Sequence, residues 1–161
     1  MRMYIAIAVS ILVASWGFAT AQDSPTDAGE CPVTLPGEGF TPPKPYPANP
    51  SVKGTHTDAW YGTEELWTIL PVDGEYGLRK SVWWSADFPG GIAEEKPPIS
   101  VTWERLDVEA PILRTGDPGT NAHTAEHRWF MIAGIDPNEP GCWQVTAEYK
   151  GTALSYVYER G

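Results

Sequence analysis

The sequence is poor in basic residues, in cysteine and in catalytic motifs. Lysine and arginine number 11 against 21 aspartates and glutamates, so the formal net charge is −10. An acidic surface repels nucleic acid and anionic lipid headgroups, and we expect neither as a partner. No G-x-S-x-G nucleophile motif occurs, and the serines are scattered along the chain. We therefore expect a protein that is not an enzyme, with no catalytic residues, no metal and no cofactor.

The N-terminal segment carries the features of an export signal. Arg2 precedes the apolar run 3–13, and Ala19-Thr20-Ala21 forms a small-x-small cleavage site. This pattern predicts a signal peptide over residues 1–21 and a secreted or periplasmic, extracytoplasmic location. An uncleaved anchor is the alternative, because the segment is about long enough to span a bilayer. After cleavage we expect no stable membrane insertion.

Proline divides the remaining chain into two regions. Residues 22–58 contain half of the 16 prolines and no apolar period, which predicts an extended arm. From Trp60 onward, short β-branched and aromatic runs alternate with turn residues, which is typical of an all-β sandwich. We assign residues 59–161 to one such domain, with about seven to eight antiparallel strands. Residues 115–125, rich in Gly, Asp, Asn and Thr, are predicted to form a loop between strands.

The most regular strand pattern covers residues 142–149. One face carries Trp143, Val145, Ala147 and Tyr149, and the other carries Cys142, Gln144, Thr146 and Glu148. The apolar face belongs in the core, so Cys142 is predicted to point outward. Two cysteines in an exported chain predict a disulfide between Cys31 and Cys142, with free thiols or partner disulfides as alternatives. Such a bond would pin the arm across the outer face of the sheet that holds Cys142.

One segment resembles a zinc-peptidase motif. His123-Thr124-Ala125-Glu126-His127 has the H-x-x-E-H spacing of the inverted zinc peptidases. That chemistry needs both histidines on one helical face, whereas the flanking residues predict loop and strand. In an extended chain, imidazoles at this spacing lie about 13 Å apart. A small metal-dependent hydrolase is thus an alternative that we disfavour, and we expect residues 123–127 to be ordinary polar loop residues.

Aromatic residues offer the best lead to a binding site. Trp83 lies out of phase with Val82 and Trp84, which predicts that Trp84 faces the core and Trp83 faces outward. Trp60 and Tyr61, near the start of the domain, are predicted to be partly open. Trp83, Trp60 and Tyr61 are therefore the possible ligand-contact residues. Exposed aromatics of this kind would stack on sugar rings or anchor a protein partner, unless the proline arm covers them.

Several short segments together resemble a known group of proteins. They are Cys31-Pro32-Val33-Thr34, Trp60-Tyr61-Gly62, Leu66-Trp67, Leu70-Pro71-Val72-Asp73-Gly74, Lys80 with Val82-Trp83-Trp84, and Pro140-Gly141-Cys142-Trp143-Gln144-Val145-Thr146. The series resembles uncharacterised bacterial exported proteins and lipoproteins that have a single immunoglobulin-like β-sandwich domain. It covers most of residues 31–158. The resemblance implies an immunoglobulin-like fold and an envelope location, and it implies no known activity. This chain has no cysteine at the cleavage site, which leaves lipid attachment unsupported.

The function expected from these features is that of an exported, non-catalytic binding or interaction module of the bacterial cell envelope. Its partner would be an unknown protein or glycan of the envelope. A carbohydrate- or cell-wall-binding domain is the main alternative. A row of three or more exposed aromatics would favour sugar binding, and one apolar patch on a polar surface would favour a protein partner.

Overall fold

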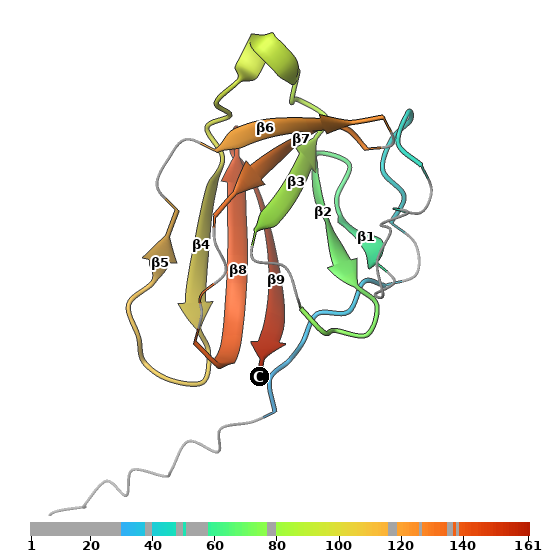
Figure 1. Cartoon of the computed structure of the whole chain (residues 1–161). Coiled ribbons are helices and arrows are strands. Elements are labelled where there is room, and N and C mark those ends of the chain that lie inside the picture. Colours follow the sequence, from blue (N-terminus) through green and yellow to red (C-terminus); the bar gives the residue numbers. More distant parts are fainter. Residues whose placement is uncertain are drawn as a thin grey trace, which may run out of the picture.

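The computed structural model describes residues 30–37, 40–47, 50, 58–76, 80–115, 119–125, 127–134, 137 and 139–161. The predicted signal peptide lies outside these residues. Within them the chain is all-β and forms two antiparallel sheets (Figure 1). The first sheet has the order β1 (Asp58–Gly62), β2 (Leu66–Pro71), β3 (Ser81–Ser85), β7 (Arg128–Ala133) and β6 (Thr120–Thr124). The second has the order β5 (Leu113–Arg114), β4 (Ser100–Arg105), β8 (Gly141–Tyr149) and β9 (Thr152–Arg160).

The predicted loop over residues 115–125 is wrong in its second half. Strand β6 pairs with β7 over its whole length, from Thr120 opposite Ile132 to Thr124 opposite Arg128. An edge strand needs no apolar alternation, because backbone hydrogen bonds on one side hold it in place. The described residues contain nine strands, against the seven to eight expected. A short 3₁₀ turn, η1 (Gly91–Glu94), connects β3 to β4.

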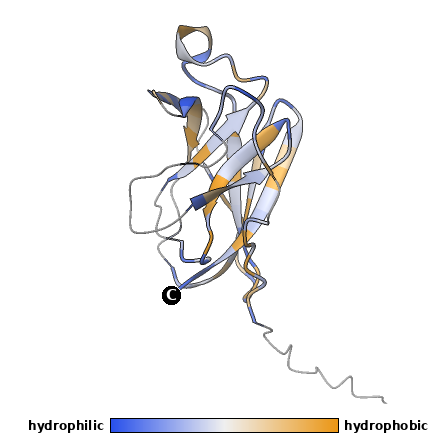
Figure 2. Ribbon diagram, turned by 90° about the vertical axis from the view of Figure 1, so that its right-hand side faces the viewer, coloured by the Kyte–Doolittle hydropathy of each residue, from blue (hydrophilic) through white to orange (hydrophobic). Residues whose placement is uncertain are grey.

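The main core lies between the two sheets, and β8 contributes to it as predicted. Its apolar face is buried at all four expected positions, namely Trp143, Val145, Ala147 and Tyr149. Leu66, Met131 and Tyr156 belong to the same cluster and come from β2, β7 and β9. Figure 2 shows how hydrophobic and hydrophilic residues are interspersed along the strands. This alternation lets each strand bury one face between the sheets.

A second apolar cluster lies on the outer face of the five-stranded sheet. It contains the buried residues Trp60, Trp67, Ile69 and Trp84. Two aromatic side chains of the arm cover it: Phe40 lies 6.3 Å from the Trp67 ring and Tyr46 lies 5.3 Å from it. Strand β2 is therefore buried at all six positions, since one face meets the other sheet and one meets the arm.

The disulfide between Cys31 and Cys142 is present, with the two Cα atoms 5.5 Å apart. Beyond it, the Thr34 N–H donates to the Val157 carbonyl at 2.8 Å, and the Val157 N–H donates to the Thr34 hydroxyl at 2.9 Å. The arm thus follows the edge of β9 before it crosses to β1 and β2 (Figure 1).

The expected course of the arm is therefore corrected. It was predicted to lie across the outer face of the sheet that holds Cys142, and instead it covers the outer face of the other sheet. The outer face of the four-stranded sheet is polar: the Thr146 and Ser155 hydroxyls lie 2.8 Å apart on it, and Glu148 is exposed. The five-stranded sheet carries the large apolar side chains, and burying these gives the arm its stabilising contact.

Candidate functional site

Trp83 faces the interior, so the predicted faces of β3 are reversed. Its side chain is 0% exposed and stacks on Tyr156, with the ring centroids 5.9 Å apart. Trp84 instead lies in the outer cluster, edge-on to Trp60 at 4.9 Å. The five-stranded sheet has two apolar faces: one packs against the other sheet in the main core, and the arm covers the other as a second core. The alternation of apolar residues along β3 therefore could not show which of Trp83 and Trp84 faces the other sheet and which faces the arm.

Trp60 and Tyr61 are also engaged within the molecule. Trp60 is 2% exposed, and its Nε1 donates to the Pro47 carbonyl at 2.9 Å. The Tyr61 hydroxyl donates to the Ser155 carbonyl at 2.9 Å, and its ring packs against the main core. The structure does not bring Trp83, Trp60 and Tyr61 together on one open surface. The arm covers Trp60, the sheets enclose Trp83, and Tyr61 reaches toward β9.

The two histidines of the H-x-x-E-H segment contact different aromatic groups. His123, on β6, lies against Trp129 with ring centroids 4.9 Å apart. His127, in the turn before β7, lies 6.0 Å from both Trp60 and Trp84. His123 lies on β6 and His127 lies in the turn before β7, so the two histidines do not share the single helical face that zinc-peptidase chemistry needs. Within the described part of the chain, no group of three or more His, Cys, Asp or Glu is placed to hold a metal ion.

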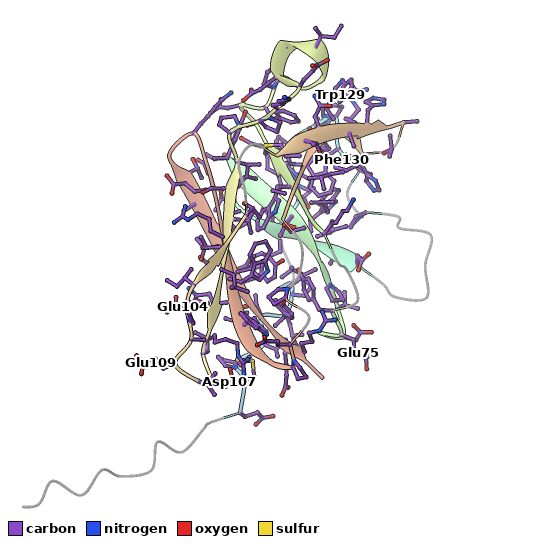
Figure 3. All side chains as sticks on the ribbon, turned by 60° about the vertical axis from the view of Figure 1, so that its left-hand side comes forward. Glu75, Glu104, Asp107, Glu109, Trp129 and Phe130 are labelled. Atoms are coloured by element: carbon purple, nitrogen blue, oxygen red, sulfur yellow. A yellow bond between two sulfur atoms is a disulfide. The ribbon has the colours of Figure 1, made fainter. Side chains whose placement is uncertain are left out.

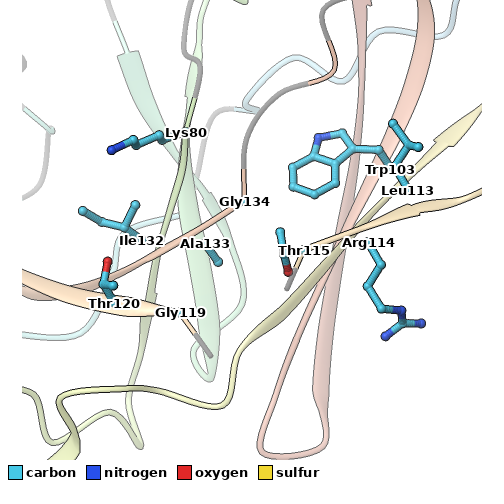
Figure 4. A pocket seen from close by; sticks show the side chains of 10 residues that line it. All are labelled: Lys80, Trp103, Leu113, Arg114, Thr115, Gly119, Thr120, Ile132, Ala133 and Gly134. Carbon is cyan, nitrogen blue, oxygen red and sulfur yellow. The ribbon is translucent and has the colours of Figure 1, made fainter. Parts of the chain in front are cut away.

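A cleft of about 430 Å³ is lined by residues of β4, β5, β6 and β7. The Trp103 indole forms one wall, and a Cβ on Gly134 would lie 2.0 Å from this ring. Lys80 and Arg114 also line the cleft, but they extend away from each other on opposite sides (Figure 4). The described lining residues therefore present no convergent set of polar groups of the kind a catalytic site requires.

Four of the eight large apolar side chains that are exposed in the described chain lie beside this cleft, on the connection between β4 and β5. We call residues 106–113 the hairpin surface. All eight of these residues are exposed, and four are large aliphatics: Leu106 at 44%, Val108 at 51%, Ile112 at 58% and Leu113 at 44%. The other exposed large apolar residues that the structure describes lie apart, on the arm, a β-turn, η1 and the start of β7. Contiguous exposed apolar area marks an interaction site more often than isolated side chains do.

The base of the hairpin surface is held firmly. The Arg105 guanidinium donates to both carboxylate oxygens of Asp107, at 2.6 and 2.7 Å. The same guanidinium lies over the Trp143 ring at 5.0 Å, and a Cβ on Gly141 would lie 2.5 Å from it. The Leu106 N–H donates to the Cys142 carbonyl at 2.8 Å. The hairpin is thereby fixed to β8 beside the disulfide, so its aliphatic side chains are exposed on a preorganised loop.

The ion pair at this base predicts a pH-dependent loosening. The hydrogen bonds from Arg105 lower the pKa of the Asp107 carboxyl from 3.8 to about 2. A lowered pKa means that the pair is intact above pH 4 and is lost as pH falls through about 2. We expect the protection factors of the amides of residues 106–109, which correct for the intrinsic pH dependence of exchange, to fall over this interval, and an NMR titration of the Asp107 carboxyl checks the midpoint.

The matched control for this prediction is a second carboxylate of the same loop. Asp107→Asn should loosen the hairpin at neutral pH, whereas Glu109→Gln should leave amide exchange unchanged. Titration of Asp107 near its ordinary value of 3.8 would contradict the proposed role of Arg105.

An exposed aromatic that the sequence reasoning missed lies at the opposite end of the molecule. Trp129 is 38% exposed, packs against Gly90 and Gly91, and supports η1, where Ile92 is 94% exposed. The Asn121 side chain donates to the Gly91 and Glu94 carbonyls at 2.8 and 3.0 Å. Figure 3 shows Trp129, at the start of β7, next to this turn. Trp129 lies at the terminus of a strand, where the facing sheet no longer covers it, and this position is the feature of the sequence from which its exposure could have been predicted.

Comparisons with protein-family models, with curated proteins and with solved structures found no match to this chain. Among the residues that the structure describes, no helix is long and apolar enough to cross a membrane.

Proposed function

We propose that this chain is an exported, non-catalytic binding module of the bacterial cell envelope, and that it docks a protein partner through the hairpin surface. The export signal read from residues 1–21 supports the location, as does the Cys31–Cys142 disulfide, because such bonds persist in oxidising compartments. Separation of the zinc-motif histidines supports a binding role over hydrolysis.

We propose further that the domain is of the immunoglobulin type. The order β2-β3-β7-β6 facing β5-β4-β8-β9 corresponds to strands A-B-E-D facing C′-C-F-G, with β1 as an additional strand. Trp103 is buried on β4, the equivalent of strand C, where immunoglobulin domains also carry a tryptophan. The disulfide differs from the antibody pattern, since Cys142 on β8 joins the arm rather than the facing sheet.

The observation that carries the proposed function is the composition of the exposed apolar residues. Among the eight large apolar side chains that are exposed in the described chain, Trp129 is the sole aromatic. Sugar-binding surfaces stack aromatic rings on sugars, whereas aliphatic patches pack against apolar protein surface. Four of the eight lie on the hairpin surface, on a segment fixed by Arg105. Rigid presentation lowers the entropic cost of binding and favours a protein partner.

We predict that removing two hairpin aliphatics abolishes most of the binding. Leu106→Ser combined with Ile112→Ser should weaken the affinity for an envelope protein captured by the mature chain at least about tenfold, as loss of hot-spot contacts does. The measurement is a titration with the captured protein after purification. Val72→Ser is the matched control, because Val72 is as exposed as Leu106, at 44%, but lies on a different turn. Equal affinity of all three proteins would contradict the proposal.

A carbohydrate- or cell-wall-binding function is the second candidate, and one observation favours it. Trp129 and His123 form an exposed aromatic pair with ring centroids 4.9 Å apart. A ring of this kind offers a stacking platform for a sugar. Binding of a cell-wall glycan that is lost in Trp129→Ala and kept in the hairpin variant would establish this candidate instead.

A further inference from the structure

We infer that the partner segment docking on the hairpin surface is basic as well as aliphatic. The inference rests on the proposed function and adds the chemistry of the partner. It starts from the charged groups around residues 106–113. Four are acids, namely Glu104, Asp107, Glu109 and Glu139, and two are bases, namely Arg105 and Arg114.

The charge of Arg105 is already compensated within the molecule. It pairs with Asp107 at 2.6 Å and approaches Glu139 at 3.7 Å, and its side chain is 11% exposed. The Glu104 and Glu109 side chains are exposed, with no ion pair to a described residue. Figure 3 shows Glu104, Asp107 and Glu109 along the same side of the β4–β5 hairpin. Two uncompensated carboxylates therefore border the aliphatic side chains, whereas the bases without an ion pair to a described residue are Arg114 and, across the cleft, Lys80.

The acidic field extends beyond the hairpin. Glu148 and Glu159 are exposed and alternate with buried residues of β8 and β9, so they share the outer face of the four-stranded sheet with Glu104. The whole chain has a formal net charge of −10. Charged groups around an apolar contact steer the encounter and select partners of opposite sign. Complementarity at this surface thus favours lysine and arginine.

The same charge argues against the other occupants of an apolar surface. A second copy of this chain would bring the same carboxylates to the contact, and like charges in an interface disfavour association. A membrane with anionic headgroups is repelled for the same reason. A sugar finds few stacking rings here, because the exposed apolar residues of the hairpin surface are aliphatic. A basic, aliphatic protein segment remains as the complementary occupant.

The strand geometry also indicates how such a segment is recognised. In the described chain β5 pairs with β4 alone, so its other edge is open to an added strand. Leu113 lies opposite Trp103 and faces the core side, while Arg114 lies opposite Thr102 on the outer face that also carries Glu104. An added strand would therefore place alternate residues beside Leu113 on the core side and beside Arg114 on the outer face, with Glu104 one strand further in. We expect aliphatic residues at the first set of positions and, at the second, lysine or arginine whose long side chains extend across the sheet toward Glu104.

The test uses a random peptide library displayed on phage. Selection on the mature protein, with counter-selection on the Leu106→Ser, Ile112→Ser variant, isolates peptides that need the hairpin surface. We expect these peptides to be enriched in lysine and arginine alternating with aliphatic residues. Their affinity should fall about tenfold or more in the Glu104→Lys, Glu109→Lys variant at low ionic strength, and it should fall with added salt. Glu64→Lys with Glu65→Lys is the control, because it makes the same charge change on the exposed β1–β2 turn.

The outcomes separate this inference from the proposed function. Enriched peptides that are neutral or acidic, or whose affinity is unchanged in the Glu104→Lys, Glu109→Lys variant, would overturn the inference and leave a hairpin-dependent binding module. An equal loss of affinity in the control variant would also overturn it, since overall charge would then explain the effect. Failure to obtain any peptide that depends on Leu106 and Ile112 would overturn both.

Discussion

Replacing Trp83 with alanine is expected to lower the free energy of unfolding by about 3–5 kcal/mol. The side chain is fully buried between the sheets and stacks on Tyr156, so its removal leaves a large cavity in the main core. Urea unfolding followed by fluorescence or circular dichroism measures the change. Trp83→Phe should cost less, because the Trp83 Nε1 is buried without a hydrogen-bond partner among the described residues.

The control for this prediction is Trp129, the exposed tryptophan at the start of β7. Trp129→Ala removes the same number of atoms from a side chain that is 38% exposed, so the loss of stability should be clearly smaller. A loss below about 1 kcal/mol for Trp83→Ala would contradict the structure, because core truncations of an aromatic cost more. It would restore the outward position that the sequence pattern predicted for this side chain.

Removing the disulfide is expected to have an effect of similar size. The bond joins residues 111 positions apart, and closing so long a loop stabilises the folded state by about 4–5 kcal/mol in the chain-entropy model. The Cys31→Ser, Cys142→Ser variant should unfold at correspondingly lower urea concentration. Limited proteolysis should also cleave its arm faster, since one of the arm's attachments to the domain is gone.

The arm is held both by the disulfide and by side-chain packing, so the two attachments can be removed separately and compared. Phe40 and Tyr46 attach the arm to Trp67 independently of the residues that form the disulfide, so Tyr46→Ala should release the arm from the outer cluster while the bond holds its first residues. Two free thiols in freshly purified native protein would contradict the disulfide. A stability change below about 1 kcal/mol in the double serine variant would show that side-chain packing alone retains the arm.

The elements that sequence reasoning predicted well were those with one buried and one polar face. In strand β8, Trp143 and its apolar partners alternate with Cys142 and polar residues. This two-residue alternation showed which face of β8 is buried, and it placed Cys142 on the opposite face, where Cys31 of the arm bonds to it. The division into an arm (22–58) and an all-β domain (59–161) was inferred from proline content, because proline removes backbone donors that strands require; its boundary stays a prediction.

The features that escaped prediction depend on tertiary contacts. Trp83 and Trp84 were assigned to the wrong faces because the arm buries the outer face of their sheet, and no local pattern encodes that cover. Strand β6 was missed because its pairing, from Thr120 to Thr124 along β7, requires backbone partners rather than apolar residues.

The hairpin surface was also missed by sequence reasoning. Its aliphatic residues resemble strand residues in composition, and only the packing of the two sheets reveals which aliphatics remain uncovered. Nothing in residues 106–113 read alone separates Ile112, at 58% exposure, from the fully buried Ile99 at the other end of β4.

Site-specific photo-crosslinking from position 112 is the most direct test of a protein partner docking on the hairpin surface. A photoreactive amino acid in place of Ile112, in protein exported by its native host, should form a covalent adduct with an envelope protein. The same group in place of Val72, which is also exposed, should form none. Adducts at both positions alike, or at neither, would contradict the account of the hairpin as the docking surface of this module.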